Sequence, residues 1–431
     1  MKLFAQLLAV ASFAVSLSVT AAPEMGLPAL DPDLEKFYVD LHQHPELAFQ
    51  EKETASKLAN RLRKAGYQVT TGIGGTGVVG ILRNGSGPTV MLRADMDALP
   101  IEEKTGLTFA SKVTGKESSG LVPVSHACGH DLHVTALAGT GAYMAAHRGA
   151  WRGTLVVIGQ PAEEGIRGAK AMLKDGLFTR FPKPDYALAI HVEDRMASGT
   201  VGWTPGWFRT SSDSVDVILH GRSGHGAKPH ETVDTVLLAA RTVVGLNTIV
   251  SREIPPGDVG VITVGTIHGG TRRNIVPEDV TLELTVRAYE PTVRRTLLAA
   301  IERVARGEAA AAGAPKGPTI TVKEGTGAVY NDPDLTERAV SALQRSLGAD
   351  AVVRMKPQMT SEDFSEYGLA GAKVLLLHVG AVAPAKLAAA GPEMRDLPSV
   401  HTPYFAPDLA PTLNTAMRAE VAILEDWMRP R

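Results

Sequence analysis

One short segment concentrates side chains that bind metal ions. Residues 125–133 contain His126, Cys128, His130, Asp131 and His133. Imidazole nitrogen and thiolate sulfur are the usual ligands of first-row divalent metals, and the Cys128-x-His130 spacing places both donors on one short turn. The alternative interpretation is a buried thiol beside structural and surface histidines, with Asp131 as the N-cap of the helix that follows. The spacing alone leaves both interpretations open.

Two adjacent carboxylates form a second candidate group. Glu163 and Glu164 directly follow an apolar segment, residues 154–158, that is typical of a buried strand. Sites in open α/β sheets gather at the carboxyl ends of strands, and two carboxylates there repel each other unless a cation or a proton lies between them. One glutamate could therefore bind a metal while its neighbour acts as a general base on water. The pattern does not say which glutamate has which role, and two solvated glutamates on a surface turn remain the alternative.

Four further residues fit the same chemistry. His191 follows the apolar segment 187–190, Asp95 and Asp97 follow the apolar segment 89–92, and His401 lies in a loop before the last predicted helix. Each one alone is more typical of a hydrogen-bonded structural residue. With Glu163 and Glu164, they place polar groups at the ends of three apolar strands, where unpaired burial would be costly.

Competing motifs are rejected by their context. Residues 72–77 match G-x-G-x-x-G, but a strand and an Asn84-Gly85 turn follow them, whereas a dinucleotide site needs a helix there. The sequence has neither a G-x-S-x-G motif nor a P-loop lysine motif. With 44 basic against 46 acidic residues and only 5% aromatic residues, it offers no feature typical of nucleic-acid binding.

The elements that would position these residues alternate between strands and helices. This order predicts an α/β domain with a mostly parallel, buried central sheet, made of residues 23–210 and 325–431. The Asn84-Gly85 pair predicts a hairpin between strands at 78–82 and 89–92. Residues 211–324 instead follow a β-α-β-β-α-β order, which indicates an inserted ferredoxin-like α+β domain.

The N-terminus has the features of an export signal. A basic start, an apolar segment and small residues near position 21 predict a cleaved signal peptide over residues 1–22. The apolar segment is shorter than the roughly 20 residues that span a bilayer, so we expect no stable membrane anchor. The mature protein is therefore expected to be periplasmic or secreted. Cys128 is the only cysteine, which excludes an intrachain disulfide.

From about residue 34 to the C-terminus the chain resembles the dinuclear metallo-amidohydrolase and carboxypeptidase family that includes aminoacylases, hippurate hydrolase and indoleacetyl-amino-acid hydrolases. The landmarks that carry the resemblance are His42 to Leu47, Arg93 to Pro100, His126 to His133, Gln160 to Gly165, Ile190 to Val192, Gly224 to Ala227, Thr360 to Phe364 and His401 to Pro403. The Cys-Gly-His form of the metal loop is similar to the N-acyl-amino-acid branch, since the dipeptidase branch has aspartate there.

The resemblance implies specific roles. It implies two divalent metal ions, manganese or zinc first and cobalt or nickel as alternatives, with five ligands: Cys128 as the bridge, His130, Glu164, His191 and His401. It also implies that Glu163 is the general base, that Asp95 and Asp97 orient the ligands, and that His225 and Asn274 of the inserted domain reach the substrate, with His225 acting on the transition state. Such a histidine can come from a partner subunit, so we expect a homodimer formed through the inserted lid domain.

The expected reaction is hydrolysis of an N-acyl amino acid, such as a hippurate-like amide, by water that a metal activates. A carboxypeptidase or dipeptidase of the same fold, acting on short peptides, is the first alternative. A non-catalytic binding domain is the second, and it is disfavoured because every expected metal donor is present.

Overall fold

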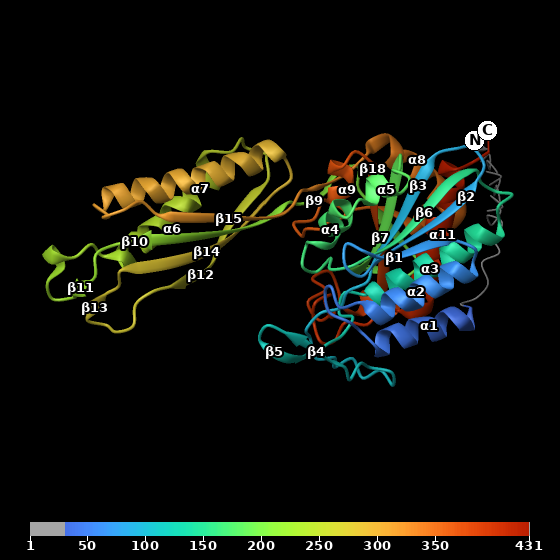
Figure 1. Ribbon diagram of the computed structural model, residues 1–431, viewed down its shortest axis with the longest axis horizontal. Coiled ribbons are helices and arrows are strands. Elements are labelled where there is room, and N and C mark those ends of the chain that lie inside the picture. Colours follow the sequence, from blue (N-terminus) through green and yellow to red (C-terminus); the bar gives the residue numbers. More distant parts are fainter. Residues whose placement is uncertain (1–30, 431) are drawn as a thin grey trace, which may run out of the picture.

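An eight-stranded sheet forms the centre of the larger domain in the computed structural model, which describes residues 31–430 (Figure 1). The predicted signal peptide lies outside the described residues. In spatial order the strands are β1 (Gln68–Ile73), β2 (Gly77–Asn84), β6 (Gly153–Gln160), β3 (Thr89–Asp95), β7 (Tyr186–Ala197), β18 (Lys373–Val382), β8 (Val201–Trp203) and β17 (Val352–Arg354). The central strands β6, β3, β7 and β18 pair in parallel. The predicted fold class is confirmed.

Helices cover both faces of this sheet, because successive side chains of each strand point to opposite faces. Leu155 and Val157 belong to one core, whereas Val156 and Ile158 belong to the other. The first core lies under α1 (Pro32–Gln43), α2 (Lys52–Lys64), α3 (His130–Ala146), α8 (Pro333–Leu347) and α11 (Leu409–Trp427). The second lies under α4 (Gly168–Lys174), α5 (Leu177–Arg180) and α9 (Ser365–Leu369). This double cover explains why the central strands are apolar without alternation.

The inserted domain has a core of its own. Its antiparallel sheet has the order β12 (Gly260–His268), β14 (Asp279–Ala288), β10 (Ser212–His220) and β15 (Thr319–Thr326). Residues of α6 (Thr235–Arg252) and α7 (Pro291–Ala311) pack on one face of it. Along β14 buried positions alternate with more exposed ones, as expected for a sheet covered on one side. The observed element order is the expected β-α-β-β-α-β arrangement.

Short ribbons complete the molecule. They are β4 (Thr114–Glu117) with β5 (Gly120–Pro123), β9 (Gly206–Arg209) with β16 (Val329–Asn331), and β11 (Gly224–His225) with β13 (Ile275–Val276). The helix α10 (Pro384–Ala389) precedes the loop of His401. Figure 1 shows β9 at the junction between the two domains, and β11 and β13 at the end of the inserted domain farthest from the large sheet. No helix within residues 31–430 combines the length and the apolar character needed to cross a membrane.

Three local predictions are wrong. The strands on either side of Asn84-Gly85 do not pair as a hairpin, because β6 lies between β2 and β3 and pairs with both. A turn favours close strands but does not choose partners, and β3, apolar on both faces, gains more burial in the sheet centre. Asp131 is not an N-cap, since the helix already begins at His130. His191 does not end its strand, because β7 continues to Ala197.

The packing of α11 on α3 generates a prediction about pH. Glu420 is buried, and its Oε2 accepts a hydrogen bond of 2.5 Å from Thr140 Oγ1. Burial raises the pKa of Glu420 from 4.5 to about 8, although the hydrogen bond from Thr140 opposes the shift. The native state therefore holds this proton over a range in which the unfolded state has lost it. Between about pH 4.5 and 8 the contribution of Glu420 to the free energy of unfolding should fall by about 1.4 kcal/mol per pH unit.

Glu420→Gln should remove that slope and stabilise the protein near pH 8 relative to the wild type. Urea unfolding across this pH range measures the effect, and Glu337→Gln, at an exposed position of α8, is the control. An unchanged slope in Glu420→Gln would contradict the prediction.

Candidate metal centre

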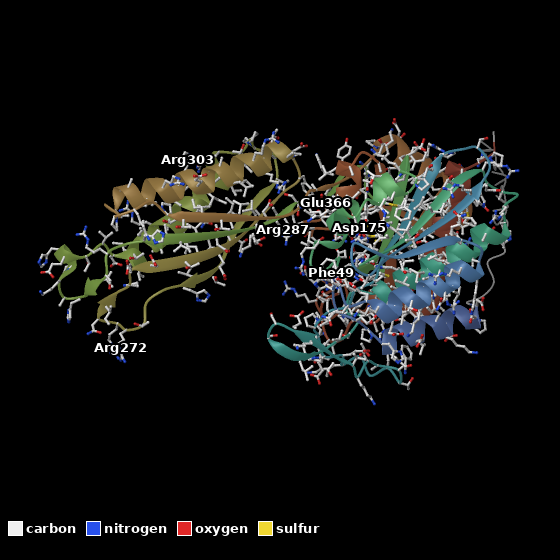
Figure 2. All side chains as sticks on the ribbon, in the orientation of Figure 1. Phe49, Asp175, Arg272, Arg287, Arg303 and Glu366 are labelled. Carbon is white, nitrogen blue, oxygen red and sulfur yellow. The ribbon has the colours of Figure 1, made fainter. Side chains whose placement is uncertain are left out.

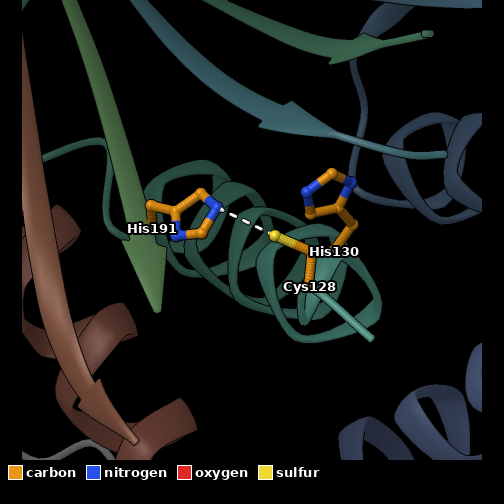
Figure 3. Close-up of side chains that lie close together, drawn as sticks. All are labelled: Cys128, His130 and His191. Carbon is orange, nitrogen blue, oxygen red and sulfur yellow. Dashed lines mark hydrogen bonds between the residues drawn. The ribbon is translucent and has the colours of Figure 1, made fainter. Parts of the chain in front are cut away.

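Five potential ligand side chains, from four separate segments, converge on one point. The thiol of Cys128 lies at the centre, with its Sγ 3.4 Å from His191 Nε2 and 3.2 Å from His401 Nε2. His401 Nε2 is also 3.3 Å from Glu164 Oε2, and His130 Nε2 is 3.9 Å from Glu164 Oε1. Figure 3 shows the Cys128 sulfur between the rings of His130 and His191. All five predicted ligands are thus brought together.

The parallel sheet is what causes this convergence. The strands β3, β6 and β7 run in the same direction, and β7 continues past the ends of the other two, so residues at or beyond the carboxyl ends of β3 and β6 meet the middle of β7. Glu164 lies in the loop after β6, and His191 projects from β7. Cys128 precedes α3, where Gly129 has a φ of 76° that a residue with a Cβ rarely adopts. A Cβ at this glycine would also lie 2.9 Å from a methyl group of Val192, so the turn requires glycine.

The hydrogen bonding of these side chains fits a bound cation. Both ring nitrogens of His130 and the Oε1 of Glu164 are buried and have no hydrogen-bond partner among the described residues. Leaving such groups unpaired in the interior is costly. His191 Nδ1 donates to the Val192 carbonyl oxygen at 2.7 Å, so its Nε2 carries the lone pair that faces Cys128. Divalent ions would satisfy the His130 Nε2, the Glu164 Oε1 and the His191 Nε2, while the His130 Nδ1 faces Asp97 Oδ1 at 3.5 Å.

The pKa values of the site agree with this interpretation. Burial, with a further contribution from Glu164, raises the pKa of the Cys128 thiol to about 12. Burial also raises the pKa of Glu163 well above its usual range, and the neighbouring carboxylates Glu362 and Glu164 add to that rise. Cations between these groups would favour their charged forms.

Asp95 and Asp97 form hydrogen bonds with residues at or next to the potential ligands. Asp97 accepts hydrogen bonds of 3.0 Å from the backbone N–H groups of both Glu163 and Glu164, one on each carboxylate oxygen. Asp95 Oδ1 lies 2.6 Å from His133 Nδ1, and the backbone N–H of Val192 donates to the Nε2 of the same ring. His133 therefore carries its proton on Nδ1 and donates it to Asp95. These contacts fix the backbone of the two glutamates and the neighbourhood of His191.

Besides Asp97, a second carboxylate contacts the loop of Glu163 and Glu164, and this contact was not predicted from the sequence. The carboxylate of Glu51 accepts a hydrogen bond of 2.8 Å from the N–H of Ala162, a non-glycine residue with a φ of 50°. This backbone conformation is unfavourable for alanine. Glu51 and Asp97 together hold the loop that carries Glu163 and Glu164. The sequence contained no signal for Glu51, which lies more than one hundred positions before its partner.

A buried charge network next to Glu163 also lacked a predicted role. Arg93, in the apolar strand β3, donates to Asp95 Oδ2 at 2.7 Å and to Glu362 Oε1 at 2.8 Å. Asp363 lies 3.3 Å from the same guanidinium, and carboxylate oxygens of Glu163, Glu362 and Asp363 lie within 4.8 Å of one another. An arginine inside a buried strand, and the acidic pair at 362–363, were the available signals. Burying a cation at β3 requires such partners.

A cleft of about 880 Å³ opens onto this centre. Cys128, Glu163, His191 and His401 are among the residues that line it on the side of the large sheet. Arg287, from β14 of the inserted domain, lines it as well, and Figure 2 shows this residue at the junction of the two domains. The volume is sufficient for a small-molecule substrate to contact the metal donors.

His225 and Asn274 lie together but away from this cleft. The N–H of Gly226 donates to the carbonyl oxygen of Asn274 at 2.8 Å, and His225 pairs with Ile275 in the ribbon of β11 and β13. This ribbon is the distal end of the inserted domain in Figure 1, and neither residue lines the cleft. Within one chain the structure does not bring them to the metal donors.

Known proteins are similar to this chain in sequence and in fold. The sequence pattern of peptidase family M20/M25/M40 matches residues 91–395. Hippurate hydrolase of Campylobacter jejuni is 36% identical over 341 residues, which cover 78% of this chain and 85% of that protein. Thermostable carboxypeptidase 1 of Saccharolobus solfataricus is 35% identical over 334 residues, which cover 76% of this chain and 80% of that protein. The crystal structure of Bacillus subtilis YXEP, a dinuclear metal-binding peptidase from the M20 family, superposes with a TM-score of 0.74 at 28% identity, covering 91% of this chain and 97% of that one.

The geometry generates a prediction about metal content. His401 lies on a loop, half-exposed, and contacts both Cys128 and Glu164, so its replacement should remove a ligand with little effect on folding. His401→Ala should lower the metal content from about two ions per chain to about one or fewer, as expected when one side of a site opens. Elemental analysis of the purified protein measures this content, and His230→Ala, at an exposed position of the inserted domain, is the control. Equal metal content in the two variants would contradict the assignment of His401.

Proposed function

The chain belongs to peptidase family M20/M25/M40, and on this basis we propose that it hydrolyses the amide bond of N-acyl amino acids. It is a metal-dependent hydrolase with the catalytic fold of that family. The observation that carries the proposal is the cluster around the Cys128 sulfur, with Glu163 beside it and a substrate-sized cleft above it. The names of three relatives support the substrate class: hippurate hydrolase, IAA-amino acid hydrolase and N-acetyl-L-cysteine deacetylase.

We assign five side chains to a pair of divalent ions. Cys128 would be the ligand shared by both ions, since its sulfur lies 3.4 Å from His191 Nε2 and 3.2 Å from His401 Nε2, and the other ligands would be His130, Glu164, His191 and His401. Mixed nitrogen, oxygen and sulfur donors suit manganese or zinc, with cobalt or nickel as alternatives. When bound, such ions would polarise an amide carbonyl and lower the pKa of water at the site to about 7.

Glu163 is the proton carrier in this proposal. Its backbone is held by Asp97, and its buried carboxylate lies beside those of Glu362 and Asp363. Burial and these carboxylates raise its affinity for a proton, which suits a base that must work near neutral pH. The Glu163 carboxylate takes a proton from the attacking water and then gives it to the nitrogen of the leaving amino acid. His225 would stabilise the tetrahedral oxyanion, with Asn274 contacting the substrate.

A carboxypeptidase is the second candidate function. Thermostable carboxypeptidase 1 is about as similar to this chain as the hippurate hydrolase is, and both reactions use the same centre. A panel that contains N-acyl amino acids and short peptides with free amino termini separates the two. Higher kcat/KM for the peptides would favour the second candidate.

Replacement of the proposed base gives a test of mechanism. Glu163→Gln keeps the size of the side chain but cannot take a proton, so kcat for hippurate should fall about 10²- to 10⁴-fold while the metal content stays unchanged. Steady-state kinetics and elemental analysis of the same preparation measure both quantities. Glu53→Gln, at an exposed position of α2, is the control. If Glu163→Gln retained wild-type kcat, Glu163 would not be the base.

We further propose a homodimer that brings His225 and Asn274 to the cleft of the partner. In the inserted domain β12 is an edge strand of the sheet, and α6 exposes Val236, Leu237 and Val244. An unpaired strand edge beside exposed apolar side chains favours association with a second chain. Such a dimer would complete the site, because each chain alone keeps these two residues at the distal ribbon.

Mixing two inactive variants tests this arrangement. In a 1:1 mixture of His225→Ala and Glu163→Gln, half of the dimers would be mixed, and each would contain one intact site, so activity should return to about a quarter of the wild type. The measurement is hippurate hydrolysis after the subunits have exchanged, with each variant alone as the control. Exchanged dimers without activity, or a chain that stays monomeric, would contradict the proposal.

The location of the protein is also a proposal. The charge and hydropathy of residues 1–22 support export to the periplasm or medium, with removal of that segment. N-terminal sequencing of the expressed protein checks this, and we expect the mature chain to begin near Pro23. A chain that retains Met1 would contradict export through a cleaved signal.

A further inference from the structure

Two arginines line the metal cleft without a carboxylate partner. Arg209 is the last residue of β9, and Arg287 comes from β14 of the inserted domain. Neither forms an ion pair with an acidic side chain of residues 31–430, whereas Arg93 below the same cleft contacts three carboxylates. Because unpaired cations are costly to bury, their position beside the metal donors indicates that they serve a ligand.

Arg209 is held by a chain of buried side chains. Its Nη2 lies 2.7 Å from His378 Nε2, and its Nη1 donates to the hydroxyl of Thr360. A guanidinium can only donate, so His378 Nε2 must accept and the imidazole proton must be on Nδ1. That Nδ1 donates in turn to Glu193 Oε2 at 2.7 Å, and Gln358 Nε2 donates to the same oxygen. The orientation of the Arg209 side chain is therefore fixed before any ligand binds.

In this arrangement some N–H groups of the Arg209 guanidinium donate no hydrogen bond to the described residues. Glu193 compensates the charge of Arg209 through the neutral ring of His378, without occupying the guanidinium itself. The Nε of Arg209 is buried and has no hydrogen-bond partner among the described residues, and the whole residue is only 8% exposed. A desolvated, oriented guanidinium with free donors is the group that best binds a carboxylate.

Arg287 offers a second cation close to the first. Its Nη1 donates to Ser361 Oγ at 3.1 Å, while Arg209 donates to the adjacent Thr360. Burial lowers the pKa of Arg287, and no neighbouring carboxylate opposes that shift. The two arginines thus reach one wall of the cleft from different domains, each with the capacity to bind an anion.

One carboxylate is common to every N-acyl amino acid and can pair with Arg287. We propose that the preferred substrate carries a second carboxylate, on the side chain of its amino-acid half, and that Arg209 binds it. The substrate class is then an N-acyl derivative of an acidic amino acid, of the aspartate or glutamate kind. This inference rests on the proposed function, because it names the substrate of the same site.

A pair of nearly isosteric substrates tests the proposal in the metal-loaded enzyme. N-benzoylglutamate and N-benzoylglutamine differ only in the charge of the side-chain terminus. For the wild type, kcat/KM should be about ten- to hundredfold higher for the glutamate compound, which is the effect expected for charge-assisted hydrogen bonds. In Arg209→Gln this ratio should fall towards one, and Arg209→Lys should retain part of it. Arg287→Gln, the matched control in the same cleft, should weaken both substrates and keep the ratio.

A binding measurement separates this inference from the proposed function. Calorimetry with the Glu163→Gln protein should give tighter binding of N-acetylglutamate than of N-acetylglutamine, and Arg209→Gln in that background should remove the difference. If no N-acyl amino acid were hydrolysed but this difference were present, the proposed reaction would fail and the carboxylate site would stand. Equal binding and equal kcat/KM for the two compounds would overturn the inference. So would an Arg209→Gln protein, folded by its melting temperature, that weakens both compounds alike.

Discussion

The structure depends on confining ionisable side chains around the sulfur of Cys128, most of them buried at the base of the cleft. Cys128, His130 and His191 are buried, and the unpaired Nε2 of His130 lies 3.9 Å from Glu164 Oε1. Bringing these groups together without cations would require a protonated thiol, a protonated carboxyl or unsatisfied imidazoles. Divalent ions would remove all three costs, so in the proposed site the folding of this region would be coupled to the binding of metal.

The large sheet makes that confinement possible. The carboxyl ends of the parallel strands lie at one edge of the sheet. Helices cover both faces, so the apolar side chains of each strand are packed into two cores that hold the strands in place. Hydrogen bonds from neighbouring residues then hold the side chains and the loop that form the site. Arg93 donates to Asp95, Asp95 accepts a hydrogen bond from His133, and Asp97 and Glu51 hold the loop of the two glutamates. The precision of the metal donors comes from this supporting set rather than from the donors themselves.

Much of this arrangement could be predicted from the sequence, and the limits have physical causes. Cys128 and His130 share a turn, and Glu163 and Glu164 follow an apolar strand, so local patterns raised metal chemistry as one of two open interpretations, and the resemblance to known enzymes decided between them. His401 is 273 positions from Cys128, and no local pattern connects two such residues; only the resemblance to known enzymes placed it in the site. The hairpin at Asn84-Gly85 failed because the choice of strand partners is decided by burial across the whole sheet. Glu51 and the Glu193–His378–Arg209 chain were missed because their roles arise from hydrogen bonds between distant segments.

The central claim is that Cys128 joins two cations, and anomalous diffraction tests it most directly. Crystals of the full chain grown with Mn²⁺ or Zn²⁺, with data collected at the absorption edge of the metal, should show two separate anomalous peaks. Both peaks should lie about 2.3 Å from Cys128 Sγ, with His130, Glu164, His191 and His401 distributed between them. A map with no peak beside this sulfur, or with a single ion that Cys128 does not contact, would contradict the account.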